Sequence, residues 1–211
     1  MRWRDAPAVA GIALATLVVS TLILLSGGLS ALSLGLGFIP ARFAGELLPA
    51  GLPLALPAFA TPLSATLVHG GVMHLLFNLV MLVFCGRLLE RALGGGGIAI
   101  LYVVGAYAAA VVQWAVEPVS AVPMIGASGA ISAIVGAYAL LYGERRTRRT
   151  GPIPADVVHV AWLAAAWIGL QLLIGAAGMG GVTVAIGAHI GGFVAGLALG
   201  RPLLLWRYRN A

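Results

Sequence analysis

The distribution of charged residues limits what this chain can fold into more than any other feature of its sequence. Five stretches carry no Asp, Glu, Lys or Arg: residues 6–41, 47–86, 92–116, 118–143 and 157–200. Each stretch exceeds the roughly 18 apolar residues that indicate a membrane-spanning helix, and the last is long enough for two. The sequence therefore predicts an all-α polytopic membrane protein with six spans.

Composition excludes several other classes of protein. Only 9% of the residues are charged and 61% are hydrophobic, whereas a soluble domain is about 25% charged. No room remains for a soluble catalytic domain, a Rossmann sheet or a zinc ribbon, so any chemistry must lie within the bundle. The single cysteine, Cys85, excludes an intramolecular disulfide and a CxxC motif. The net charge of +6 comes from arginines near span ends, which favours contact with anionic lipid over a nucleic-acid partner.

We expect one membrane domain whose spans lie at about residues 7–26, 64–87, 98–116, 128–143, 157–177 and 184–205. The stretch 27–63 is rich in proline but poor in polar residues, which predicts a broken segment lying in the membrane interface. Four successive glycines, residues 94–97, predict a helix stop and a tight turn after the second span. Just before this turn, Glu90 is expected to form a loop ion pair with Arg87 or Arg91.

The arginines also predict the orientation of the chain. All of them except Arg42 fall on one side of the six-span arrangement. The positive-inside rule places that side, with both termini, in the cytoplasm. The leader before Pro7 is too short for a cleavable signal peptide, so we expect a retained first helix and a prokaryotic cytoplasmic membrane.

Polar side chains inside a span are costly, so each needs a partner or a purpose. In this topology the second, fourth and sixth spans all run inward from the outer surface, and they carry His74 with Asn78, Ser128, and His189. At a rise of 1.5 Å per residue, the histidines lie roughly 8–15 Å below that surface. His74 and Asn78, four residues apart, share one helix face and can direct two donors at one point. They could equally hydrogen-bond to neighbouring helices.

Small residues surround the serine and the second histidine. Ser128 lies between Gly126 and Gly129 at the start of a span, where glycines permit a sharp entry and the helix N-terminus favours a developing anion. Gly192 and Gly196 form a GxxxG face after His189. Ser132 continues a stripe of small residues on the fourth span, so the two helices can approach closely. Ordinary helix packing and a satisfied core histidine remain alternative explanations.

The residue types that are absent from the spans limit the possible catalytic mechanisms further. No Asp or Glu lies in the middle of any predicted span, so neither a buried Ser-His-Asp triad nor a pair of catalytic aspartates can form, and HExxH is absent. The hydrolytic arrangement that remains is a dyad in which His189 takes a proton from Ser128 and the serine attacks a carbonyl. The backbone N–H of Ser128, with His74 and Asn78, would hold the oxyanion.

These residues, taken together, resemble the rhomboid family of intramembrane serine proteases. The resemblance covers about residues 59–200 and depends on four motifs in order. They are His69-Gly-Gly-Val-Met-His74-Leu-Leu-Phe-Asn78, Glu90-Arg-Ala-Leu-Gly94, Gly126-Ala-Ser128-Gly129 and Ala188-His189-Ile-Gly-Gly192 with Gly196. The resemblance implies a six-helix rhomboid core with Ser128 as nucleophile and His189 as general base. It also implies a water-filled cavity open to the outside, entry of a helical substrate between the second and fifth spans, and cleavage near the outer membrane boundary.

Two features depart from the family pattern. Ala60-Thr61 stands where relatives commonly carry a Trp-Arg pair. Ser132 replaces an aromatic ring that packs against the histidine in many relatives, and it could instead hydrogen-bond the imidazole and fix its tautomer. His69 matches a family position and is taken as structural support, together with Gly126, Gly129, Gly192 and Gly196.

Three functional classes remain for a chain with these motifs. The main prediction is a serine endopeptidase that acts on transmembrane proteins within the bilayer and needs no metal or organic cofactor. One rival is a catalytically silent relative that binds transmembrane helices. The other is a channel or transporter that uses His69, His74 and His189 as a proton or metal site. The sequence leaves the physiological substrate and the oligomeric state open.

Overall fold

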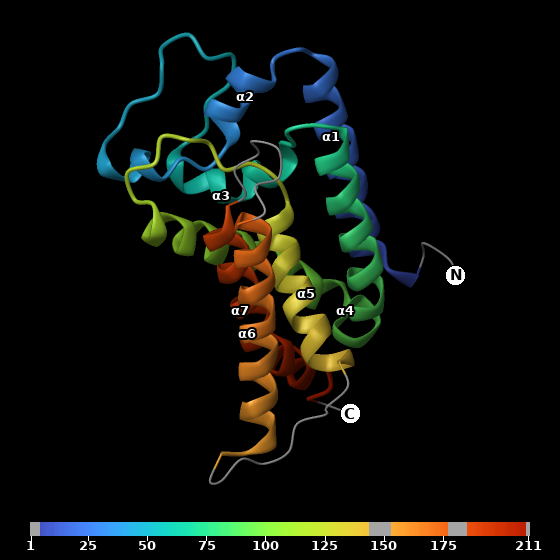
Figure 1. The fold of residues 1–211 in the computed structure, drawn as a ribbon. Helices are drawn as coiled ribbons and strands as arrows, with labels where there is room; N and C mark the ends of the chain where they lie inside the picture. The colour runs from blue at the N-terminus through green and yellow to red at the C-terminus, as the bar shows by residue number, and fades with distance from the viewer. Residues whose placement is uncertain (1–4, 144–152, 177–184, 210–211) are drawn as a thin grey trace.

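The computed structural model describes residues 5–143, 153–176 and 185–209. Within these ranges the chain is helical apart from its loops and one isolated β-bridge between Phe38 and Met124, which confirms the predicted all-α class (Figure 1). The α-helices are α1 (Pro7–Leu25), α2 (Leu29–Leu36), α3 (Thr61–Ser64), α4 (Val72–Val116), α5 (Ser128–Tyr142), α6 (Ala155–Ala176) and α7 (Ile186–Arg207). Short 3₁₀ turns cover Pro40–Ala44, Ala58–Ala60 and Ala65–Leu67.

Three of the described helices, α1, α4 and α7, are both long enough and apolar enough to cross a membrane, and α5 and α6 contain shorter apolar stretches. Large apolar side chains on their outer faces are exposed, among them Leu22, Phe77 and Phe84. An apolar outer face is stable only where lipid replaces water, which agrees with the membrane class predicted from the charge distribution.

Helix α4 is two helices joined at one residue. Its 45 residues would extend about 68 Å as a straight helix, far more than the roughly 30 Å of a hydrocarbon core. Gly94 has φ 74° and ψ 169°, a conformation that L side chains rarely adopt, and the chain turns back there (Figure 1). The two arms are residues 72–93 and 95–116.

The boundaries of the second predicted span are wrong. The helix begins at Val72 rather than near residue 64, because residues 58–67 form short separate turns and Gly70 and Gly71 interrupt the chain before it. It continues to residue 93 rather than 87. Only Gly94 leaves helical geometry, and the following three glycines belong to the next arm. An apolar run locates membrane depth but not the point at which a helix starts.

Helix α5 lies in the centre of the bundle, against the second arm of α4 and against α7. Glycines permit these close contacts. A β-carbon on Gly192 would collide with the carbonyl oxygen of Gly129, and one on Gly196 would collide with that of Ala133. On the other side, a β-carbon on Gly105 would lie 2.6 Å from the β-carbon of Ala133. The backbone of α5 is therefore held at close range by both neighbours.

Glu90 is buried, with 4% of its surface exposed, rather than placed in a loop. Its carboxylate accepts the backbone N–H groups of Ala8 and Val9 at 2.9 and 2.8 Å. These are donors at the start of α1 that have no acceptor within the helix. Arg91 pairs instead with Asp5 at 3.4 Å. The loop ion pair expected for Glu90 is thus replaced by a helix cap, because α1 packs against the first arm of α4.

Candidate active site

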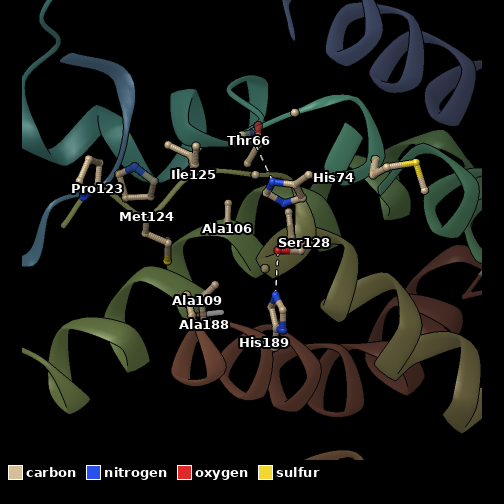
Figure 2. Close-up of a pocket in the computed structure, with 18 of the residues that line it drawn as sticks. Thr66, His74, Ala106, Ala109, Pro123, Met124, Ile125, Ser128, Ala188 and His189 are labelled. Atoms are coloured by element: carbon tan, nitrogen blue, oxygen red, sulfur yellow. Dashed lines mark hydrogen bonds between the residues drawn. The ribbon is translucent and has the colours of Figure 1, made fainter. Parts of the chain in front are cut away.

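Ser128 and His189 meet where α5 and α7 begin. Ser128 is the first residue of α5, and His189 lies in the first turn of α7. Nε2 of the imidazole lies 2.8 Å from Oγ of the serine (Figure 2). The contact is possible because the two helices approach at Gly129 and Gly192, one residue and three residues away from the pair.

The pair faces a cavity of about 660 Å³. One water needs roughly 10–15 Å³ of such space, so the cavity has room for many waters and for a peptide segment. Its walls come from residues 70–74 and 123–126, from the second arm of α4 and from the first turns of α5 and α7. Besides the pair, the polar side chains that line it are Thr66 and His74.

His74 presents an N–H group to the serine. Its Nδ1 accepts the backbone N–H of Gly70 at 3.3 Å, so in the neutral imidazole the proton is carried by Nε2. That nitrogen lies beside Gly126, where φ is +110°, and it points toward Ser128 (Figure 2). The imidazole can therefore donate a hydrogen bond into the cavity close to the serine oxygen.

Asn78 lies on the same arm but is turned away from the cavity. Its Nδ2 donates to the backbone carbonyl of His74 at 2.8 Å, and 6% of its surface is exposed. The two residues share a helix face, as their spacing indicates, yet in this structure only His74 lines the cavity.

His69 lies behind the serine and is fully buried. Its Nε2 accepts the N–H of Ala127 at 3.4 Å, so Nδ1 carries the proton and donates to Oγ of Ser20 at 2.9 Å. The Ser20 hydroxyl in turn donates to the carbonyl of Leu67 at 2.8 Å. His69 thus connects α1 to the residue that precedes Ser128 and does not line the cavity.

Three further backbone hydrogen bonds fix the loop that leads to the serine. Met124 exchanges backbone hydrogen bonds with Phe38 at 2.8 and 3.0 Å, and the N–H of Gly126 donates to Ala65 at 2.9 Å. Phe38, in the stretch 27–63, and Ala65, just after it, therefore hold the entry to α5 in place, and the sequence pattern did not indicate these contacts.

Ser132 does not hydrogen-bond the imidazole, whose two nitrogens have Gln171 and Ser128 as partners. Its hydroxyl donates to the carbonyl of Ser128 at 2.8 Å, one turn back along the same helix. The expectation that it fixes the tautomer of His189 is therefore wrong. Serine on a helix often bonds the carbonyl four residues earlier, because that oxygen lies within reach of its short side chain.

Three residues contact the first turns of α7 without having been assigned a role from sequence. Oε1 of Gln171 lies 2.8 Å from Nδ1 of His189, and the indole N–H of Trp167 donates to the carbonyl of His189 at 3.3 Å. Oε1 of Gln113 accepts the N–H of Ala188 at 3.2 Å. For the two glutamines, the signal in the sequence was a polar side chain inside a predicted span, since a buried amide requires a partner.

The arrangement can activate a serine hydroxyl. A carbonyl oxygen such as Oε1 of Gln171 can only accept, so Nδ1 of His189 carries the proton and Nε2 is free to accept from Ser128. Ser128 is also the first residue of its helix, so its own N–H has no acceptor within the helix. A hydroxyl, an adjacent imidazole nitrogen that can accept its proton, and N–H groups that can donate to an anion thus surround one cavity. Among the described residues, no three His, Cys, Asp or Glu side chains are grouped as metal ligands.

Comparison with known proteins agrees with these motifs. Residues 58–206 match the model of the Rhomboid domain. The chain is 32% identical over 149 residues to Rhomboid protease GlpG of Serratia proteamaculans (strain 568), which covers 70% of this chain and 48% of that protein. It is also 32% identical over 135 residues to Rhomboid protease GlpG of Enterobacter sp. (strain 638), covering 63% and 44%. The chain thus spans about half the length of the curated relatives it matches.

Proposed function

The chain belongs to the rhomboid family, and we propose that it is a serine endopeptidase that cleaves transmembrane proteins within the bilayer. The observation that carries the proposal is the 2.8 Å contact between Nε2 of His189 and Oγ of Ser128 at the cavity. Both GlpG relatives are proteases by name, and the apolar helices make this chain an integral membrane protein.

In the first half of the proposed reaction, Oγ of Ser128 attacks the scissile carbonyl while Nε2 of His189 takes the hydroxyl proton. The tetrahedral intermediate then collapses, His189 returns the proton to the leaving amine, and the substrate's acyl group stays on the serine as an ester. In the second half, a water gives its proton to His189 and attacks this ester. The carboxylic product leaves and Ser128 regains its proton.

The negative charge that develops on the carbonyl oxygen needs donors in place before the reaction. We assign this role to Nε2–H of His74 and to the backbone N–H of Ser128, at the positive end of the α5 dipole. Asn78 joins them if its amide rotates away from the His74 carbonyl that it bonds in this structure.

The proposed topology has six spans, counting the two arms of α4 separately. Asp5, Arg91 and the turn at Gly94 lie at one end of the bundle, where Arg207 also lies against Gly94. The cavity is bordered by the loops at the other end. By the positive-inside rule we place the arginine end and both termini in the cytoplasm, so the cavity opens to the outside of a bacterial cytoplasmic membrane. Substrate helices would be cut near that outer boundary.

The alternative is a catalytically silent member of the family that binds transmembrane helices. Ala60-Thr61 in place of the Trp-Arg pair and the orientation of Asn78 are the observations that favour it. Such a protein would bind substrates without turning them over.

The test is cleavage of a panel of single-span substrates by the purified protein in liposomes, with Ser128→Ala and His189→Ala beside the wild type. We expect the wild type to cut and each variant to lose activity by about three orders of magnitude or more. A wild type that binds the panel without cutting it supports the silent alternative. Cleavage that survives Ser128→Ala rejects the proposed nucleophile.

A further inference from the structure

Gln171 is a buried polar residue on α6 that the proposed reaction does not use. Its side chain is 4% exposed, and its Oε1 lies 2.8 Å from Nδ1 of His189. Ser128 contacts the opposite edge of the same imidazole, at Nε2. The histidine ring is thus held between a hydroxyl on α5 and an amide on α6.

The contact belongs to a group of four residues, two on α6 and two on α7, that pack against one another. Trp167 and Gln171 are four residues apart on α6, and His189 and Phe193 are four apart on α7, so each pair occupies one helix face. The indole of Trp167 stacks on the ring of Phe193 with centroids 4.7 Å apart and planes at 7°. The same indole donates to the backbone carbonyl of His189 at 3.3 Å. Residue 171 is therefore held one turn from a packed aromatic pair, opposite the imidazole.

We propose that Gln171 is a positioning residue for His189. Its Oε1 accepts a hydrogen bond from Nδ1–H of the imidazole, holds the ring in one orientation, and so leaves the Nε2 lone pair directed at Ser128. Without an acceptor at Nδ1, the neutral ring can carry its proton on Nε2 instead, where it would donate to Oγ and could not act as a base. This inference depends on the proposed function, because it concerns the base of that reaction.

No other described side chain takes this role. Ser132 directs its hydroxyl to the carbonyl of Ser128, and the stretches 118–143 and 157–200 contain no Asp or Glu. An amide at this position orients the ring without adding a buried charge, which would be costly in the middle of a membrane protein.

Two substitutions separate this role from simple packing. Gln171→Met keeps the length and volume of the side chain but removes the acceptor. Gln171→Glu is nearly isosteric and keeps an acceptor oxygen whether the carboxyl group is ionised or protonated. If the acceptor oxygen at residue 171 supports the reaction, activity falls from the wild type to Gln171→Glu and falls further in Gln171→Met. If only packing matters, Met is at least as active as Glu, because it brings no polar group into the site.

The readouts are kcat and KM for one transmembrane substrate, with thermal unfolding in the same detergent to confirm that each variant is folded. We expect Gln171→Met to lower kcat about 10- to 100-fold, with KM changed less than about threefold. Leu173→Met, an exposed position on the same helix, is the matched control and should behave as wild type. A Met variant with wild-type kcat, or one that exceeds the Glu variant, overturns the inference and leaves the Ser128 and His189 assignments intact.

A spectroscopic measurement tests the inference without any substrate. In protein labelled with ¹⁵N-histidine, the ring nitrogen shifts of His189 identify which nitrogen carries the proton, and a His189→Ala sample assigns the signals. We expect the Nδ1–H tautomer in the wild type and a mixture of tautomers in Gln171→Met. An Nε2–H tautomer in the wild type overturns the inference whether or not the protein cleaves substrates, whereas loss of the proposed protease function alone would leave this signal unchanged.

Discussion

A β-carbon on Gly126 would lie 2.6 Å from Nε2 of His74, the atom that faces Ser128. No side chain fits there without moving the imidazole. The φ of +110° at Gly126 is also strained for any L residue. We therefore expect Gly126→Ala to displace the proposed oxyanion donor and to lower kcat by about 100-fold or more. Steady-state cleavage kinetics with a liposome-embedded substrate would measure this loss.

The matched control for this prediction is Gly11→Ala in α1, where a β-carbon would meet no atom within 4 Å. It should leave activity unchanged and stabilise the helix slightly, by up to about 1 kcal/mol. Equal activity losses in the two variants would show that the effect at residue 126 is not specific to the site.

His74 and Asn78 are expected to differ in their contribution to the rate. His74 lines the cavity with a free N–H, whereas Asn78 must first break its 2.8 Å bond to the His74 carbonyl. We expect His74→Ala to lower kcat about 100-fold or more and Asn78→Ala by about tenfold. Parallel kinetic measurements on both variants decide the order. A larger loss from Asn78→Ala would indicate that the amide rotates toward the oxyanion during the reaction.

His69 should contribute to the stability of the fold, because it joins α1 to Ala127, the residue before the proposed nucleophile. Removing it leaves the buried N–H of Ala127 without its acceptor and removes the donor to Ser20, whose hydroxyl keeps only its bond to the Leu67 carbonyl. His69→Ala is expected to lower the free energy of unfolding by about 2–4 kcal/mol, and Ser20→Ala by about 1–2 kcal/mol. Thermal unfolding in detergent measures both. Equal, small effects would mean that this connection does not support the loop.

The motif residues were the part of the site that could be predicted from sequence. Ser128, His74 and His189 are polar residues inside apolar runs, and such residues are rare enough in a membrane to be conspicuous. Small residues on facing spans indicated that α5 and α7 could approach closely, and the structure shows this contact at Gly129 and Gly192. These signals are local and do not require knowledge of the partner helix.

The partners of polar groups could not be predicted in the same way. Ser132 bonds its own helix, Glu90 caps α1, and Gln171 meets His189 across two helices. The partner of each side chain depends on how one helix is rotated relative to its neighbours. The spacing of residues along a single helix does not determine this rotation. The start of α4 at Val72 was missed for a related reason, because apolar content remains high through the short turns before it.

Ser132→Ala is expected to change activity by less than about threefold. Its hydroxyl bonds the Ser128 carbonyl, and in an α-helix that oxygen also accepts the N–H of the residue four positions later, so no buried acceptor is left unsatisfied. Cleavage assays with Ser132→Ala and Gln171→Met side by side give the comparison. A loss for the first variant as large as for the second would contradict the separate roles of these two residues.

Glu90 should stabilise the fold far more than the nearby ion pair on the surface of the same end of the bundle. Its buried carboxylate accepts two donors at the start of α1, at 2.9 and 2.8 Å. Charged acceptors at helix N-termini are favoured by the helix dipole. Glu90→Ala leaves both N–H groups without their acceptor, and we expect a loss of about 2–4 kcal/mol in the free energy of unfolding.

The control is Asp5→Asn, which removes an exposed ion pair with Arg91 at 3.4 Å and should lower the free energy of unfolding by less than about 1 kcal/mol. Chemical unfolding of both variants in mixed micelles gives the two values, and similar losses would show that the buried cap adds nothing beyond an ordinary surface charge.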